Sequence, residues 1–167
     1  MTDLRAVMTS LGYADVATYI QSGNVVFSTD EEDTALLAAT IEGAIAGALA
    51  VTPRVVVLSG AELAQVARDN PYAAETNPKA VHVVFSGEDP DPGLVDAVAA
   101  AQQQAARDGS RDEARFVGRA LYLHTPDGYG RSVLAELLAR ARGPLSARAT
   151  GTARNWATVT KLVTLCD

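Results

Sequence analysis

The sequence predicts an α+β fold in which one arrangement of helices and strands occurs twice. The chain of 167 residues is 48% hydrophobic and 20% charged, which is enough apolar material for a buried core. Apolar residues follow helical spacing in some segments and strand spacing in others. The order of these segments restarts after a polar, proline-containing stretch at residues 70–78.

The first half is expected to open with a helix and a hairpin. Thr2 and Asp3 can cap the helix, and Gly12 can end it in a left-handed conformation. The hairpin strands are rich in β-branched and aromatic residues and flank a turn whose glycine and asparagine tolerate positive φ angles. These strands are expected at residues 17–21 and 25–27.

A long helix, a strand and a short helix are expected to complete the first half. The long helix follows the acidic residues 30–33, which the positive end of a helix dipole stabilises. The apolar run at residues 55–58 is expected to be a buried strand. Ser59 and Glu62 have the spacing of a capping box, so a helix is expected to continue through Val66.

The second half is expected to begin with a strand and then to repeat the same order. Asp91 and Pro92 can start a long helix, Gly118 and Arg119 can turn a second hairpin, and Gly143-Pro144 can stop a further helix. The expected elements are a strand at 80–85, a helix from Asp91, strands at 115–117 and 120–124, a helix around 133–138, a weak strand at 147–150 and a last helix at 155–166.

The two halves match if the first has lost an opening strand. We therefore expect a tandem duplication of ferredoxin-like split βαβ units, with antiparallel sheets covered on one face by helices and with the first unit lacking its opening strand. The expected domains are an N-terminally incomplete first repeat at residues 1–70, a connector at 71–79, and a second repeat with a C-terminal helix at 80–167.

The expected loss of this strand bears on the start of the chain. An opening strand normally lies inside its sheet, so its loss leaves backbone donors and apolar neighbours that need a partner. Met1 is then not expected to be the natural start. The alternative is a first half built with three strands.

Charge and cysteine content restrict the location and the partners. The net charge of −6 repels phosphate backbones, so nucleic acid is disfavoured. Cys166 is the single cysteine, and no basic segment leads into an apolar run near Met1, so a cytoplasmic location is expected. The low-polarity stretch 41–51 falls far short of the ~20 residues that cross a bilayer, so no membrane association is expected.

Motifs near both ends of the chain carry a resemblance to a known family. They are Tyr-Ile-Gln-Ser-Gly-Asn-Val-Val-Phe at residues 19–27 and Thr-Ala-Arg-Asn-Trp-Ala-Thr-Val-Thr-Lys-Leu at residues 152–162, with shorter matches at 77–79, 121–123 and 126–132. Over essentially its whole length the chain resembles the bacterial domain-of-unknown-function family 1697. The resemblance implies a duplicated α+β architecture and no established activity.

The chain also departs from this family. Its members typically begin with a hydrophobic strand and a Gly-rich loop similar to Arg-Gly-Ile-Asn-Val-Gly-Gly, and nothing before Met1 matches these features. Any activity that needs the loop is therefore in doubt for this chain.

The first hairpin turn is one candidate site for binding a ligand or a partner. Gln21, Ser22, Gly23 and Asn24 offer amide and hydroxyl groups at its tip, where a small ligand or a partner backbone could bind. The alternative is that glycine and asparagine serve only the turn conformation, and that the neighbouring polar side chains satisfy loop backbone.

The start of the last helix is a second candidate site. Arg154, Thr158 and Lys161 are spaced to lie on one arc of a helix, and Thr152 with free backbone amides could help Arg154 to hold a phosphate or carboxylate. The alternative is that Thr152 caps the helix, Asn155 bonds to a neighbouring loop, and Lys161 is solvated.

A glycine-containing turn is a weaker candidate site. Gly128, Tyr129, Gly130 and Arg131 precede a helix, but their spacing fits neither the Rossmann fingerprint nor the phosphate-loop motif. Tyr129 and Arg131 could contact an anion. The alternative is that the glycines permit the turn and Ser132 caps the helix that follows.

No metal site, cofactor or catalytic residue is identified from the sequence. His82 and His124 lie in expected strands without a neighbouring ligand cluster. No serine lies in a nucleophile elbow, and Cys166 is expected near the apolar side of a helix, where a thiol is usually inert.

The sequence favours a binding or interaction module for an unknown small anion or protein partner. One alternative is a phosphate-handling enzyme or nucleotide binder that uses the basic C-terminal helix. Another is RNA binding on a sheet surface, where Tyr19, Phe27 and Tyr122 could stack bases. The oligomeric state and any reaction are left open.

Overall fold

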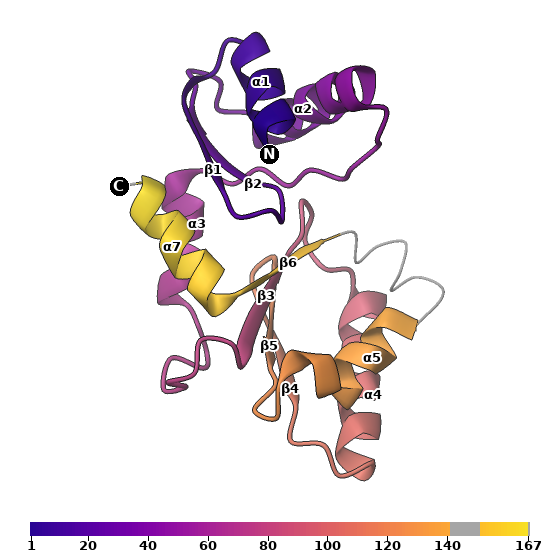
Figure 1. The fold of residues 1–167 in the computed structure, drawn as a ribbon. Helices are drawn as coiled ribbons and strands as arrows, with labels where there is room; N and C mark the ends of the chain where they lie inside the picture. Colours follow the sequence, from indigo (N-terminus) through magenta and orange to yellow (C-terminus); the bar gives the residue numbers. More distant parts are fainter. Residues whose placement is uncertain (141–150, 167) are drawn as a thin grey trace. The chain divides into compact units, whose positions relative to one another are not determined.

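The computed structural model describes residues 1–140 and 151–166 (Figure 1). The chain divides into two compact units, one formed by Met1–Leu63 with Lys161–Asp167 and the other by Ala64–Thr160. The strands form two separate antiparallel sheets, one of two strands and one of four. The α+β class predicted from the sequence is confirmed. The predicted domain boundaries and the duplication remain predictions.

The first unit contains a hairpin, two helices and the ends of two more. The hairpin packs with α1 and α2 around a cluster of five buried residues: Val7, Met8, Val16, Ile41 and Ile45. The elements are α1 (Thr2–Ser10), β1 (Ala14–Tyr19), β2 (Asn24–Ser28), α2 (Thr34–Leu49), the start of α3 (Gly60–Arg68) and the end of α7 (Trp156–Cys166).

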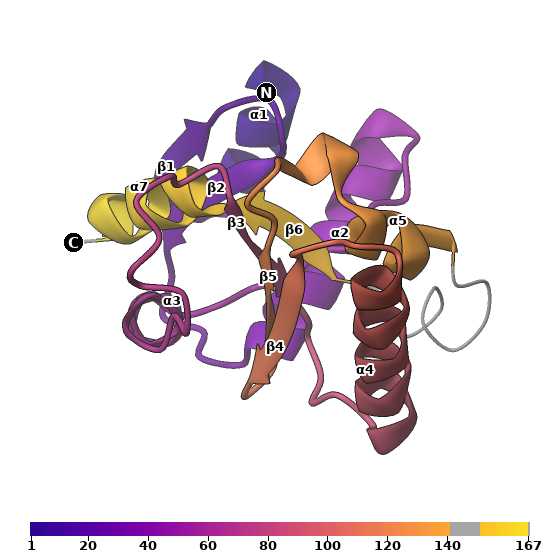
Figure 2. The same ribbon diagram turned by 90° about the horizontal axis from the view of Figure 1, so that it is seen from below.

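The second unit is built around the four-stranded sheet, which Figure 2 shows with α4 and α5 beside it. In chain order the elements are β3 (Val81–Phe85), α4 (Pro92–Arg107), β4 (Glu113–Val117), β5 (Ala120–His124), the 3-10 turn η1 (Tyr129–Arg131), α5 (Val133–Arg140) and β6 (Thr152–Asn155). The sheet order is β4-β5-β3-β6. The opening strand β3 therefore lies inside the sheet, as a split βαβ unit requires.

Local capping fixes several helix starts where the sequence predicts them. Asp91 accepts a hydrogen bond from the Leu94 amide at 3.0 Å, and a proline follows it at the helix start. Ser59 and Glu62 bond reciprocally to each other's backbone amides at 2.8 and 3.1 Å, which is a capping box. Asp33 caps α2 by accepting from two amides.

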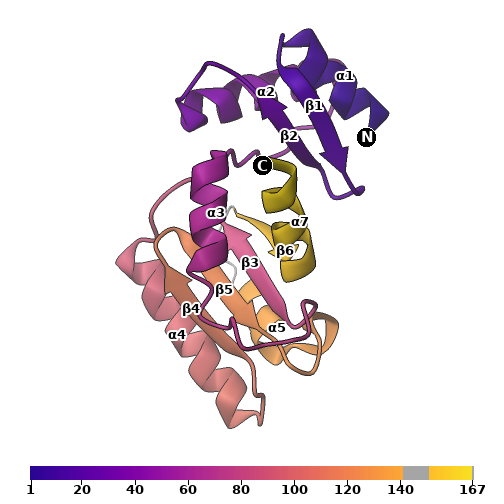
Figure 3. The same ribbon diagram turned by 90° about the vertical axis from the view of Figure 1, so that its left-hand side faces the viewer.

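Both faces of the four-stranded sheet are covered, which corrects the prediction that helices cover one face. The α4 and α5 helices pack on one face around a cluster that includes Leu121 and Leu123. On the other face Tyr122 and Val83 are both 0% exposed. The Tyr122 hydroxyl donates to the Val66 carbonyl of α3 at 2.7 Å, and Figure 3 shows α3 and α7 over this face.

Residues 55–58 do not form the predicted strand. A strand needs a neighbour with which to exchange backbone hydrogen bonds. In the second unit the last strand, β6, pairs with β3. Among the described residues, the sheet of the first unit contains only β1 and β2, and residues 55–58 pair with neither.

Two helix starts differ from the prediction. The first helix begins at Thr2 with Met1 as its N-cap and no capping side chain, so Thr2 and Asp3 lie inside the helix. The last helix begins at Trp156, because residues 152–155 form β6. The predicted stop at Gly143-Pro144 and the weak strand at 147–150 lie outside the described residues.

In the part of the chain that the structure describes, no helix is long and apolar enough to span a lipid bilayer.

Candidate interaction surface

Strand β2 lies at an edge of its sheet, whereas β5, the second strand of the other hairpin, lies inside its sheet. Within the described residues β2 pairs only with β1. β5 pairs with β4 on one side and β3 on the other. Four of the five residues of β5 are buried, whereas Asn24 alone is buried in β2.

The other edge strands carry features that discourage further pairing, and β2 does not. Natural edge strands commonly carry charges or bulges for this purpose. β1 has a register shift between Ala14 and Ala17, with Asp15 at a φ of +52°. β4 carries Glu113 and Arg115 on its five residues. β2, with the sequence Asn-Val-Val-Phe-Ser, has no charge and no bulge, which is the composition of an interior strand.

Residues 55–58 form a second apolar segment whose backbone is not paired in a sheet. All four residues are half-buried, and Val55 and Val57 pack against the same core cluster as Val25 and Phe27 of β2. The Val55 amide donates to the Glu42 carboxylate at 2.7 Å. Among the described residues, the backbone groups of residues 56–58 have no hydrogen-bond partner. We call β2 and residues 55–58 together the acceptor edge.

The predicted turn residues lie at one end of the acceptor edge. Asn24 is 7% exposed and donates to the Tyr19 carbonyl at 3.2 Å and to the Ser22 hydroxyl at 2.9 Å, while Gly23 has a φ of +79°. These contacts hold the turn together. Gln21 is exposed.

The residue before the predicted turn motif is strained. Ile20 has a φ of +48° although it is β-branched, and 50% of its surface is exposed. The turn therefore presents an apolar side chain in an unfavourable backbone conformation at its tip, a feature typical of contact sites.

The predicted basic arc on the last helix does not form. Thr152, Arg154 and Asn155 lie on strand β6, so Arg154 has no helical spacing to Thr158 or Lys161. Thr152 is therefore not the helix cap. That role belongs to Asn155, whose side chain accepts from the Thr158 amide at 2.9 Å. Thr158 is itself 4% exposed, and Lys161 belongs to the first unit.

Arg154 makes two side-chain hydrogen bonds within its own strand. Its guanidinium donates to the Thr152 hydroxyl and to the Ala153 carbonyl. Burial lowers the pKa of Arg154 from its usual value. A half-buried arginine that is bonded to its own backbone is not arranged as an open anion site.

The glycines at residues 128 and 130 belong to a turn before α5, and Ser132 caps that helix, as the alternative interpretation of the sequence predicts. Gly128 has a φ of +97°, and the Ser132 hydroxyl accepts from the Ala135 amide at 2.9 Å, so Ser132 caps α5. The ring of Tyr129 lies 4.2 Å from that of His82. Arg131 is exposed, as is Gly130.

A polar cluster in the second unit was not predicted. His124 Nε2 lies 2.8 Å from Glu75 Oε2, and the imidazole stacks on the Tyr72 ring at 5.0 Å. Burial, together with the nearby Glu113 carboxylate, raises the pKa of Tyr72 to about 12. This cluster ties the connector to β5. The polar, proline-containing composition of residues 70–78 gave no signal for it.

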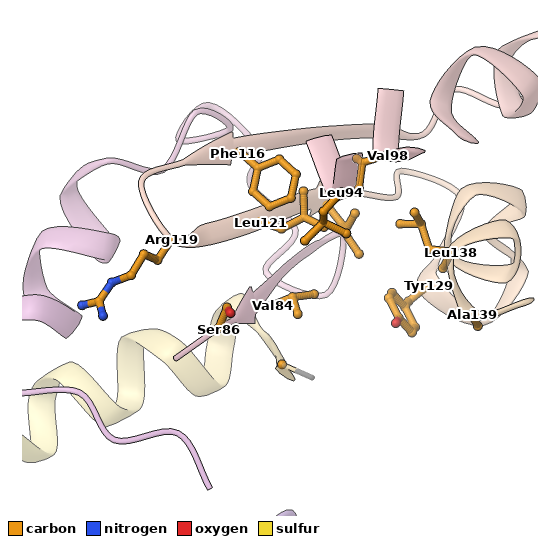
Figure 4. Close-up of a pocket in the computed structure, with 13 residues that line it drawn as sticks. Val84, Ser86, Leu94, Val98, Phe116, Arg119, Leu121, Tyr129, Leu138 and Ala139 are labelled. Carbon is orange, nitrogen blue, oxygen red and sulfur yellow. The ribbon is translucent and has the colours of Figure 1, made fainter. Parts of the chain in front are cut away.

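Figure 4 shows an apolar cavity of about 170 Å³ between the sheet and α4 and α5. Leu94, Val98, Phe116 and Leu121 gather on one side of it, while the Arg119 guanidinium points away from them. The cavity shares most of its apolar lining with the core cluster of the second unit. Most of its described lining residues are apolar, and the polar groups of a ligand site would have to converge on the cavity, whereas the Arg119 guanidinium does not.

Base stacking on Tyr122 and metal binding are two further possibilities considered from the sequence. Tyr122 is 0% exposed, so its ring is not available for base stacking. Within residues 1–140 and 151–166, no three side chains of His, Cys, Asp or Glu gather where they could hold a metal ion.

Comparison with known proteins finds a family profile and a solved structure that are similar to this chain. Residues 1–122 match the profile of the family DUF1697, described as a protein of unknown function. The fold is similar to that of a conserved bacterial protein from Streptococcus pneumoniae, with 21% sequence identity and a TM-score of 0.71, over 100% of this chain and 88% of that chain. This similarity shows the fold alone. No curated protein has a matching sequence.

Proposed function

Because the chain belongs to the DUF1697 family of proteins of unknown function, which confirms the resemblance seen in its motifs, we propose a role from the geometry of this chain itself. The chain is a protein-interaction module, and the acceptor edge is its binding surface. The observation that carries this proposal is that β2 has the apolar, uncharged sequence of an interior strand but lies at an edge of the sheet that the described residues form.

The physical driving force comes from two sources. Covering the half-buried residues Val25, Phe27, Val55 and Val57 removes apolar surface from water, at roughly 25 cal/mol per Å². A partner backbone can also satisfy the N–H and C=O groups of residues 56–58, each bond contributing about 0.5–1.5 kcal/mol. Both terms favour an extended polypeptide over a small anion.

Charge indicates the kind of polypeptide that fits. The acceptor edge contains no charged residue, so the contacting segment is apolar. Residues 1–63 contain eight acidic and two basic residues, and four of the acids follow β2 directly at residues 30–33. An acidic surface around an apolar edge favours a partner whose apolar segment is flanked by basic residues.

The proposal places the chain in the cytoplasm, in agreement with its single cysteine at residue 166. A phosphate-handling role has less support, because Arg154 is half-buried and bonded within β6. RNA binding has less support because of the negative net charge and because Tyr122 is buried.

A labelled peptide tests the proposal. Two lysines followed by the sequence of residues 80–86, the segment around β3, give an apolar strand with a basic flank. We expect saturable binding to the full chain by fluorescence anisotropy. Val26→Lys places a charge on the acceptor edge and should weaken binding at least tenfold, because it introduces an edge charge and repels the lysines.

Ala17→Lys is the matched control. Ala17 pairs with Val26 across the hairpin, so this variant adds the same charge on β1, and it should bind like the unsubstituted chain. Equal thermal unfolding midpoints would show that both variants are folded. Absence of saturable binding contradicts the proposal. A dimer that Val26→Lys converts to a monomer would assign the edge to a second copy of the chain and also overturns it.

A further inference from the structure

We propose that the cavity of the second unit binds a small neutral aromatic molecule that carries one N–H or O–H group, and that His82 accepts a hydrogen bond from this group. The site lies in the second unit and does not involve the acceptor edge, so this binding is additional to the proposed function. Three features support it: the size and lining of the cavity, an unpartnered ring nitrogen beside it, and a tyrosine that contacts both.

The cavity has the size and the lining of a site for one aromatic ring. Its volume is about 170 Å³, and an apolar cavity of about 150 Å³ holds one benzene molecule. Its walls come from the sheet, α4 and α5 and are mostly apolar, for example Val84, Leu94 and Leu138. Figure 4 shows Tyr129 across the cavity from Phe116, so a ligand ring can contact aromatic side chains. Such walls exclude a charged ligand, because burying an unpaired charge is unfavourable.

His82 lies beside this cavity on β3. Val84 lines the cavity, and residues two apart on a strand point to the same face of the sheet, so His82 shares that face. Its cross-strand partner Leu123 also lines the cavity. The ring centroids of Tyr129 and His82 are 4.2 Å apart, and Tyr129 is part of the cavity wall. Tyr129 therefore contacts both the imidazole and the cavity.

The imidazole of His82 has a hydrogen-bonding group that the described residues leave unused. Its Nδ1 atom is buried and has no hydrogen-bond partner among them. Burial lowers the pKa of His82 from its ordinary value of 6.5, so the ring is neutral at pH 7. A neutral imidazole has one N–H donor and one acceptor nitrogen. Because a buried N–H without a partner is rarer in proteins than an unused acceptor, the proton is assigned to Nε2, which leaves Nδ1 as an acceptor.

The position of Tyr129 gives a ligand access to His82. The Tyr129 side chain is 39% exposed, so it can turn towards solvent without displacing the core. The backbone of its turn is held by a hydrogen bond from the Arg131 amide to the Gly128 carbonyl at 3.0 Å, so only the side chain has to move. A ligand ring in its place keeps the aromatic contact with the imidazole and donates to Nδ1.

Phenol and toluene are matched probes of this site, because they have nearly the same shape and only phenol has an O–H group. With the intact chain, phenol titrated in a nuclear magnetic resonance experiment should cause saturable shifts of the methyl groups of Val84 and Leu121. His82→Leu removes the acceptor nitrogen. It should weaken phenol binding by about fivefold or more, as the loss of one hydrogen bond typically does, and it should not weaken toluene binding.

Ala135→Leu and Ala99→Leu are matched variants that test the position of the probe. Ala135 lines the cavity from α5, so the larger side chain fills the cavity and should abolish binding of both probes. Ala99 is exposed on α4, so its variant should bind like the unsubstituted chain. Thermal unfolding midpoints show whether each variant is folded. If Ala135→Leu is unfolded, Overhauser contacts between phenol and the Val84 methyl groups in the unsubstituted chain locate the probe instead.

Each contrary outcome overturns a stated part of the proposal. Absence of saturable phenol binding would mean that the cavity is a packing void and not a site. Phenol binding that His82→Leu leaves unchanged, or an equal loss for toluene, would show that His82 is not the acceptor. Binding that persists in folded Ala135→Leu, or phenol without contacts to Val84, would place the probe outside the cavity. None of these results bears on the acceptor edge, which the lysine-tagged peptide tests separately.

Discussion

Val26 of β2 is paired with Ala17 of β1, and no described strand lies on its other side. On the opposite side of this pair, the β1 edge is interrupted by a register shift and an aspartate with positive φ. The hairpin is therefore asymmetric, with one edge that resists pairing and one that permits it. A further strand can therefore pair with β2 more readily than with β1.

An open edge without charge also predicts self-association on heating. Val26→Lys should raise the temperature at which light scattering begins to increase, because a lysine on an edge opposes edge-to-edge pairing. Ala17→Lys should leave that temperature near the value of the unsubstituted chain. An equal rise in both variants would mean that net charge, and not the β2 edge, controls association.

The hydroxyl of Tyr122 should contribute measurably to stability. It donates to the Val66 carbonyl at 2.7 Å and joins α3 to β5 inside the second unit. Tyr122→Phe should lower the free energy of unfolding by about 1 kcal/mol, as the loss of one buried hydrogen bond typically does. Urea unfolding followed by circular dichroism measures this change.

Tyr129→Phe is the control for that measurement. Tyr129 is 39% exposed, so removing its hydroxyl should change the free energy of unfolding much less. Equal losses in the two variants would contradict the role assigned to the Tyr122 hydroxyl.

The pair of Glu75 and His124 predicts an effect of acid. The Asn77 amide and the His124 side chain lower the pKa of Glu75 from its ordinary 4.5. Its stabilising contribution is therefore complete above pH 4.5 and is lost as the pH falls through the lowered pKa. Glu75→Gln should reduce the melting temperature at pH 7, and the difference should vanish in acid.

Glu88→Gln provides the comparison for that pH series. Glu88 is an exposed glutamate of the same unit, in the loop between β3 and α4. Its substitution should leave the melting temperature nearly unchanged at both ends of the series. A Glu75→Gln difference that is the same at every pH would contradict a role for the ionised carboxylate.

Features that depend on neighbouring residues could be predicted from the sequence. The capping box of Ser59 and Glu62, the Asp91 cap and the two hairpins each depend on groups only a few residues apart. The same is true of Ser132, whose capping role was one of the two readings of the glycine turn. Such local interactions are encoded in short stretches of sequence.

Features that depend on distant residues could not be predicted in this way. Residues 55–58 have the composition of a strand, but a strand also needs a partner, and the described first unit supplies none. Thr152 and Arg154 suit the start of a helix, but their backbones pair with β3, so both residues lie in a strand. His124 and Glu75 are 49 residues apart, and no local pattern connects them.

The candidate surface was predicted in part. The turn residues Gln21, Ser22, Gly23 and Asn24 were chosen from sequence, and they lie at the end of β2. The edge itself was not chosen, because sequence does not show whether a strand is at the edge or in the interior of a sheet. Arg154 and Lys161 are predicted site residues because of their positive charge. Arg154 is partly buried, which lowers its pKa, so it does not offer an open site for an anion.

Cross-strand nuclear Overhauser effects in a peptide complex test the central claim most directly. With the chain isotope-labelled and the peptide of residues 80–86 with its two leading lysines bound, we expect contacts between backbone protons of the peptide and those of Val26, together with contacts to residues 56–58. Contacts to Ala17 and the β1 edge instead, or none to either strand, would contradict the claim that the acceptor edge is the binding surface.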